Sequence, residues 1–208
     1  MQIKAIRQTR NPDKLDLIFE DESKLRILAT LVPDLGLYAK MEVDTNLLAR
    51  IREANEQASA KVRAVRIVSA SNVSQAELRR RLIQKGENPA YAAEAVGWLA
   101  DLGAVDDQKT ANLLAQRAAA KGYGKARIRQ ELYQKGIPKE FWDVAMEGLP
   151  EPDDAIDRFL QQKLRGSVPD EKEKKRLTDA LCRRGHRWSD IKAAWGRYLE
   201  NLDEAWED

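Results

Sequence analysis

Cysteine and histidine are almost absent from this chain of 208 residues, which holds one of each, Cys182 and His186. One cysteine cannot form an intramolecular disulfide, and we expect a reducing cytoplasm as the compartment. One histidine leaves little material for a Ser–His or Cys–His nucleophile pair, and two ligands do not make a zinc site. We therefore expect no catalytic residue, no metal and no cofactor. Cys182 is predicted to be a small buried group beside Leu181, and His186 a turn residue.

Long apolar runs are absent too, and the chain does not begin with a charged segment followed by an apolar one, as a signal peptide does. We therefore expect a soluble protein that does not bind membranes. A strong excess of either charge is also missing, since the formal net charge is +2. The charge is unevenly spread, because residues 61–150 hold 15 basic and 10 acidic side chains, whereas both ends are mildly acidic. A domain that holds duplex DNA usually has a heavier basic excess. We expect only weak direct DNA binding.

Two pairs of adjacent acids, Asp106-Asp107 and Asp153-Asp154, could suggest a metal-dependent nuclease. Adjacent side chains at a helix start diverge, however, and one of each pair can cap exposed backbone amides. Helix capping is therefore the favoured interpretation. Gly122-Tyr123-Gly124 precedes a helix start, where phosphate can bind in principle, but no strand precedes it and no Gly-Lys-Ser/Thr follows. We interpret it as a tight turn between helices.

What the chain does contain is an internal repeat. Two apolar residues four apart are followed, four residues later, by a glycine, and the three glycines lie 50 and 49 residues apart. Apolar residues at this spacing share one face of a helix, and a glycine after the last of them ends it. Apolar residues also return ten and thirteen residues after each glycine. The three copies are Leu78/Leu82/Gly86, Ile128/Leu132/Gly136 and Leu177/Leu181/Gly185.

Each repeat is predicted to be three helices of about 45 to 50 residues in all, none of which can bury its apolar face alone. The expected fold class is mainly α, with tandem three-helix, helix-turn-helix-like repeats in an elongated, curved array and a small N-terminal β-hairpin element. The expected domains are residues 1–45 (β element and linker), 46–103 (repeat 1), 104–152 (repeat 2) and 153–208 (repeat 3 with a solvated acidic tail).

The β element is indicated by period-two alternation of apolar and polar residues. Leu15, Leu17 and Phe19 alternate with acids, a polar turn follows, and Leu25 and Ile27 alternate with bases. These two segments predict a hairpin, to which residues 3–9 can add a third strand. From residue 46 the pattern becomes helical.

The candidate binding residues are bases that helix capping does not explain. A basic residue stands one place before each repeat glycine (Lys85, Lys135, Arg184). The helix dipole favours a positive charge near the C-terminus of a helix, so these three residues have a structural explanation. Three consecutive arginines, by contrast, cannot share one helix face, so part of that cluster must face solvent or a partner. The candidates for contact with a partner or with DNA are Arg79, Arg80, Arg81, Lys125, Arg127 and Arg129.

Several segments together resemble the RecX family, regulators of the RecA recombinase. The resemblance covers about residues 60 to 200, and the N-terminal hairpin resembles the leader of longer members. In that leader, Lys40 stands where a glycine is expected. Farther along the chain, Lys109-Thr110-Ala111 lacks an aromatic that often follows the Asp-Asp turn. The matching segments are Ser74–Leu78, Leu102–Asp107, Gly122–Leu132 and Lys135–Ile137.

The resemblance implies a non-enzymatic regulator that binds the groove of the RecA filament on single-stranded DNA. Such a protein modulates ATP hydrolysis, strand exchange and filament growth, with inhibition the expected direction. We expect it to act as a monomer. The residues by themselves leave a second possibility open, a free-standing helical repeat protein that binds DNA or RNA through the same arginines.

Overall fold

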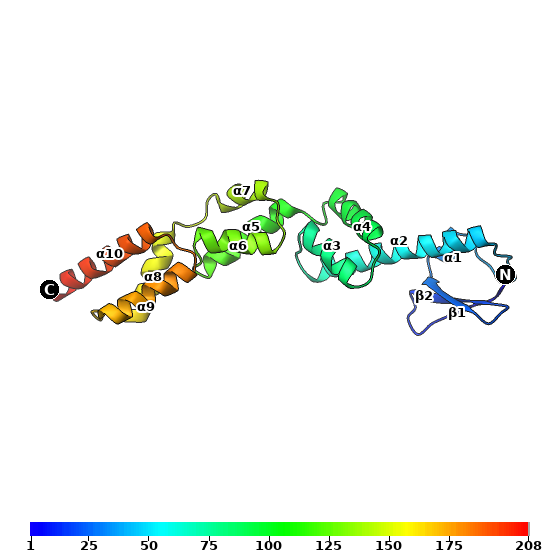
Figure 1. Cartoon of the computed structure of the whole chain (residues 1–208), viewed down its shortest axis with the longest axis horizontal. Coiled ribbons are helices and arrows are strands. Elements are labelled where there is room, and N and C mark those ends of the chain that lie inside the picture. The colour runs from blue at the N-terminus through cyan, green and yellow to red at the C-terminus, as the bar shows by residue number, and fades with distance from the viewer. Residues whose placement is uncertain (208) are drawn as a thin grey trace. The chain divides into compact units, whose positions relative to one another are not determined.

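A computed structural model of the chain describes residues 1–207, and for Pro152 and residues 203–207 it describes the backbone alone. The chain divides into two compact units, Met1–Val105 and Asp106–Asp208 (Figure 1). Helices make up most of both units, and a small three-stranded antiparallel sheet begins the first. The predicted class, mainly α with an N-terminal β element, is confirmed. Among the described residues, no helix is both long and apolar enough to cross a membrane.

The sheet contains both strands of the predicted hairpin and the third strand. Its order is β1 (Ile3–Gln8), β2 (Lys14–Phe19) and β3 (Lys24–Leu28). Leu17 of β2 pairs with Leu25 of β3, in the register that the alternation requires.

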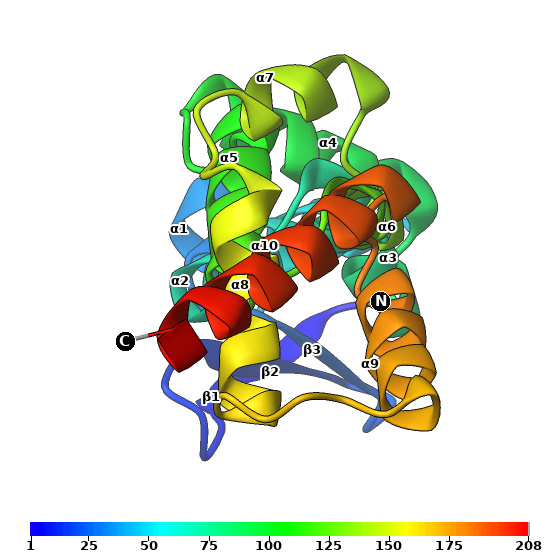
Figure 2. The ribbon, with the colours of Figure 1, turned by 90° about the vertical axis from the view of Figure 1, so that its left-hand side faces the viewer.

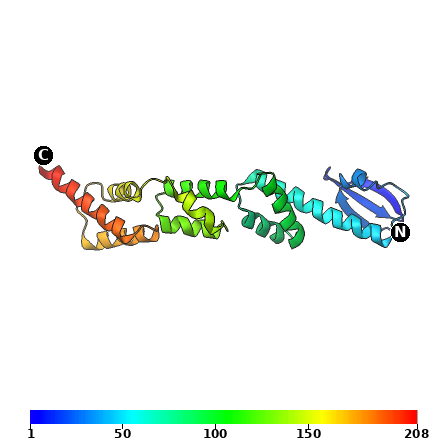
Figure 3. The ribbon, with the colours of Figure 1, turned by 90° about the horizontal axis from the view of Figure 1, so that it is seen from above.

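A short helix, α1 (Leu31–Asp34), connects the sheet to the long helix α2 (Thr45–Ala70). Asp44 caps α2 by accepting a hydrogen bond from the amide of Leu47. The sheet lies along the N-terminal half of α2, where Ile51 is fully buried (Figure 3). Asn55 fixes the two together, because its side chain accepts a hydrogen bond from the amide of Leu28 and donates one to the carbonyl of Arg26.

The C-terminal half of α2 packs instead on two further helices, α3 (Gln75–Gln84) and α4 (Pro89–Asp101). Ser74 caps α3 by accepting from the amide of Glu77, and Asn88 caps α4, which has a proline at its first helical position. The helices α2, α3 and α4 thus share an apolar core of their own.

The second unit holds two further groups of helices. The first comprises α5 (Asp107–Ala120), α6 (Lys125–Gln134), the 3₁₀ turn η1 (Lys139–Phe141) and α7 (Trp142–Met146). The second comprises α8 (Pro152–Leu164), α9 (Glu171–Arg183) and α10 (Trp188–Glu207), and in Figure 2 α8 and α10 lie side by side.

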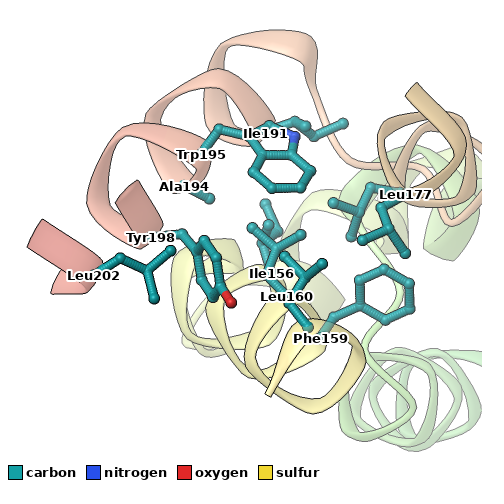
Figure 4. Close-up of a cluster of buried hydrophobic side chains, with 11 residues drawn as sticks. Ile156, Phe159, Leu160, Leu177, Ile191, Ala194, Trp195, Tyr198 and Leu202 are labelled. Atoms are coloured by element: carbon teal, nitrogen blue, oxygen red, sulfur yellow. The ribbon is translucent and has the colours of Figure 1, made fainter. Parts of the chain in front are cut away.

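Trp195 and Tyr198 of α10 close the last core over Ile156 and Leu160 of α8 (Figure 4). Their rings meet edge to face, with centroids 6.1 Å apart, an arrangement that aromatic pairs favour. Leu202 belongs to the same core, so α10 extends through most of the segment that was predicted to be a solvated acidic tail. The prediction of a solvated segment is therefore wrong at Leu202, whose side chain is buried in this core. Asp208 lies outside the described residues.

The three repeat glycines end their helices in the same way. Gly86, Gly136 and Gly185 all have positive φ, of 88°, 68° and 86°. In each copy the residue after the glycine donates its amide to the carbonyl of the leucine four residues before the glycine, which is the Schellman pattern. Those leucines, Leu82, Leu132 and Leu181, are 0% exposed, so the predicted equivalent core positions are confirmed.

Lys40 has a positive φ of 71°, the left-handed region that side chains with a Cβ adopt at a cost. Its amide donates to the carbonyl of Ile3 and its carbonyl accepts from the Gln2 side chain, which hold this conformation against β1. The backbone thus explains why a glycine is expected at this position in the family's leader.

Candidate partner-binding surface

The first candidate cluster lies on α3 of the N-terminal unit. Leu78 and Leu82 face the core, so Arg79 and Arg80 between them face solvent. Within the described residues, neither arginine has an ion pair or a side-chain hydrogen bond. Both positive charges are therefore available to a partner.

Arg81 differs from its two neighbours, because its side chain is tied to the protein. Its guanidinium donates to the carboxylate of Glu77 and to the hydroxyl of Ser71. The Glu77 side chain is only 5% exposed, and a carboxylate that is buried this far needs a partner. Removing Arg81 would thus disturb the fold, which sets this arginine apart from Arg79 and Arg80.

The second candidate cluster lies on α6 of the second unit, around buried Ile128 and Leu132. Lys125 is exposed in the first helical turn, where the helix dipole disfavours a cation. Helix stability therefore does not account for this lysine. Arg129 is exposed and lies 3.4 Å from a carboxylate oxygen of Asp143, whose side chain is 85% exposed. A surface pair of this kind contributes only about 0 to 1 kcal/mol, so Arg129 can exchange it for another anion.

Arg127 is held in place more firmly. Its guanidinium carbon lies 5.7 Å from the centroid of the Tyr123 ring, and Nη1 donates to Oε1 of Gln130 at 3.0 Å. A carboxylate oxygen of Glu131 lies 3.9 Å from its Nε. Of the six predicted residues, Arg79, Arg80 and Lys125 have no ion pair among the described residues, Arg129 has one exposed pair, and Arg81 and Arg127 are held by neighbouring side chains.

Sequence reasoning missed the joint between α6 and the end of α9. Gly124 donates its amide to the carbonyl of Arg184 at 2.9 Å, and Ala126 donates to the carbonyl of Gly185 at 3.3 Å. The turn Gly122-Tyr123-Gly124 does connect two helices, as predicted, and it also receives the turn after α9. The signal available in the sequence was the pair of glycines in one turn.

His186 lies in the turn after α9, as predicted, and it is buried in this joint, since it is only 8% exposed. Its ring Nε2 lies 3.1 Å from the carbonyl oxygen of Gly122, which can only accept, so Nε2 carries the proton. Nδ1 is then an acceptor that is buried without a partner among the described residues. Burial lowers the pKa of His186, and Arg184 lowers it further, against the opposing effects of the Gly122 carbonyl and Asp190.

Cys182 is exposed, which contradicts its predicted burial. The side chain of Leu181 faces the core, so the side chain of Cys182 beside it faces solvent. Nowhere in the described chain do three His, Cys, Asp or Glu side chains gather in a way that could hold a metal ion.

The two aspartate pairs have separate structural roles. Asp106 accepts from the amide of Lys109 at 2.9 Å, a bond that lowers its pKa, so it caps α5 as predicted. Asp153 instead lies 3.3 Å from the guanidinium of Arg197, and α8 has no side-chain cap. The prediction of a cap is thus correct for the first pair and wrong for the second.

Comparison with known proteins identifies the family. Residues 106–146 match the family described as "RecX, second three-helix domain". The regulatory protein RecX of Shigella dysenteriae serotype 1 is 34% identical over 151 residues, which are 66% of this chain and 90% of that protein. The regulatory protein RecX of Escherichia coli K12 has the same identity and coverage.

Two solved structures share the fold. A crystal structure of regulatory protein RecX has a TM-score of 0.67 at 18% identity, covering 92% of this chain and 98% of that one. RecX from Lactobacillus salivarius has a TM-score of 0.57 at 16% identity, covering 72% of this chain and 98% of that one. With a third of the residues identical over nearly the whole length of the two curated relatives, this chain belongs to the RecX family of regulatory proteins.

Proposed function

We propose that this protein regulates the RecA recombinase by binding the RecA filament on single-stranded DNA, and that it lowers ATP hydrolysis, strand exchange and filament growth. Membership of a family of regulatory proteins supports the proposal. The observation that carries the binding role is the pair Arg79 and Arg80, which present charge from α3 without a partner among the described residues.

Lys125 and Arg129 on α6 are proposed as a second set of contacts. Phosphate and carboxylate are the groups that these cations would recognise, since Arg binds planar anions with two parallel hydrogen bonds. Arg81 and Arg127 are proposed to position the clusters rather than to touch the partner.

Co-sedimentation with RecA filaments on single-stranded DNA tests the proposal. The variant R79E/R80E should keep its circular dichroism spectrum, because both side chains are exposed, and should lose at least tenfold in capture. The matched control is R50E/R52E, which makes the same charge change on exposed residues of α2. Equal capture by the two variants would remove α3 from the binding surface.

The alternative function, a free-standing nucleic-acid-binding protein, calls for a different measurement. Salt titrations would compare single-stranded DNA alone with the same DNA coated by RecA and a slowly hydrolysed nucleotide. Binding to bare DNA should be weak and should fade as salt rises, because it depends on phosphate contacts. Binding to the filament should fall less steeply, because buried apolar area is not screened by salt. Coinciding slopes and affinities would favour the alternative.

A further inference from the structure

A hollow of about 320 Å³ lies in the N-terminal unit, between the sheet and the end of α3. One wall is a stripe of α2 that runs from Ser59 to Ile67. The β1–β2 turn at Asn11 and the end of β3 at Leu28 form a second wall, and Lys85 closes the far side. The β element thus completes a concave surface that the helices alone would leave open.

Four cations and one carboxylate line this hollow. Arg63 already has a partner, because its Nε lies 2.5 Å from a carboxylate oxygen of Glu87. No such partner is found for the side chains of Lys14, Arg66 and Lys85 within the described chain. Asp13 is the single acid of the lining. Like charges that converge without a counterion favour an anionic ligand.

The residues of α2 that line the hollow lie on one face of the helix, at the spacing that is typical of a buried face. Ser59, the pair Val62-Arg63 and the pair Arg66-Ile67 follow one another at intervals of three or four residues, the spacing of one helix stripe. Val62 (43% exposed) and Arg66 of this stripe are nevertheless exposed, whereas Ile67 packs against the core that α2 shares with α3 and α4. The stripe offers both charge and apolar surface, as a nucleotide with its phosphate and its base would require.

The hollow does not end at the β1–β2 turn. A second hollow on the other side of this turn shares Asn11 and Lys14 with the first and adds Arg10. Its other cation, Arg26, is paired with Asp16 at 2.8 Å. The cations therefore lie in a row that passes the β1–β2 turn, as the binding of successive phosphates requires. A single small anion would need only one of them.

We propose that this path, from Lys85 and Arg66 to Lys14 and Arg10, binds the phosphate groups of single-stranded DNA. It is a DNA contact separate from the residues of α3 and α6 proposed above, and it does not require RecA. The β element, which carries Arg10 and Lys14, then contributes directly to binding.

Fluorescence anisotropy with a labelled oligothymidylate in the absence of RecA provides the test. The variant K14Q/R66Q/K85Q removes the three unpaired cations of the first hollow and spares Arg63, whose ion pair supports the fold. Each contact with a single-stranded phosphate contributes about 0.7 to the slope of log K against log salt. The slope should therefore become less negative by about 2, and affinity at low salt should fall.

The control K24Q/R50Q/R52Q removes the same charge from exposed residues of this unit that line neither hollow. It should leave the slope within about 0.5 of the wild-type value, since none of its cations is expected to meet a phosphate. The variant D13N gives a test of opposite sign, because it removes the only acid of the first lining and should tighten binding.

Three results would overturn the proposal. The triple variant and its control could behave alike on bare DNA. The triple variant could weaken capture of RecA filaments alone, which would assign the hollow to an acidic protein surface. The variant D13N could bind the oligonucleotide no more tightly than the wild type, which would show that the charge of the first hollow does not affect binding. None of these results changes what is expected of Arg79 and Arg80 in filament capture.

Discussion

The backbone of Gly124 lies directly against the backbone of Gly185, so closely that a Cβ atom on Gly124 would overlap the carbonyl oxygen of Gly185. A Cβ atom on Gly185 would in turn overlap the amide nitrogen of Arg127. Two turns from different helical groups of one unit thus meet at a point where neither can carry a side chain. The hydrogen bonds of Gly124 and Ala126 to this turn depend on that approach.

Substitution of the repeat glycines should distinguish backbone conformation from packing. Gly86 and Gly185 have almost the same φ, but a Cβ on Gly86 would meet nothing within 4 Å. G86A should therefore cost only the left-handed strain of about 1 to 2 kcal/mol. G185A should cost about 1 to 3 kcal/mol more through overpacking. Urea unfolding followed by circular dichroism measures both, and equal losses would contradict the close approach at the joint.

The core position of Leu132 can be tested against the residue beside it. Leu132 is fully buried, whereas Tyr133 is 71% exposed. L132A should lower the free energy of unfolding by about 2 to 5 kcal/mol, since it removes transfer energy and leaves a cavity. Y133A should change it by less than about 0.5 kcal/mol. A loss below that value for L132A would refute the alignment of the repeats.

Stability should depend on pH through His186, the only histidine of the chain. Its pKa is lowered in the folded protein, so below about pH 6.5 the unfolded chain takes up a proton that the folded protein does not. The free energy of unfolding should therefore fall as pH falls from 6.5 toward the folded pKa, and should be unaffected by this group above pH 7. In H186Q this dependence should vanish. Unfolding curves between pH 7.5 and 5 that are parallel for both proteins would show that His186 titrates freely.

Relief of the left-handed backbone at Lys40 should stabilise the N-terminal unit. K40G removes strain of about 1 to 2 kcal/mol and adds an entropic cost of about 0.5 to 1 kcal/mol, so a net gain of about 0.5 to 1 kcal/mol is expected. K24G, at the first residue of the sheet's edge strand β3, has no such strain to relieve and should be destabilising. A thermal unfolding midpoint that drops in both variants would contradict this account.

The amino-acid sequence by itself determined the features that depend on neighbours within one helical turn or one strand pair. The three glycine stops, the buried leucines before them, the caps at Ser74 and Asp106 and the β1–β3 strands follow from local spacing, because capping and side-chain periodicity act over at most four residues along the chain. The same reasoning indicated that part of the cluster formed by Arg79, Arg80 and Arg81 faces away from the core.

Only the tertiary structure decided which of the remaining polar residues are free. His186 is buried against Gly122, which lies 64 residues earlier in the chain, and the amide of Gly124 is bonded to the carbonyl of Arg184. The basic hollow likewise unites Lys14, Arg66 and Lys85 from a turn and two helices. Such contacts depend on how elements pack across the chain, and hydrophobic burial fixes that packing without leaving a local signal in the sequence.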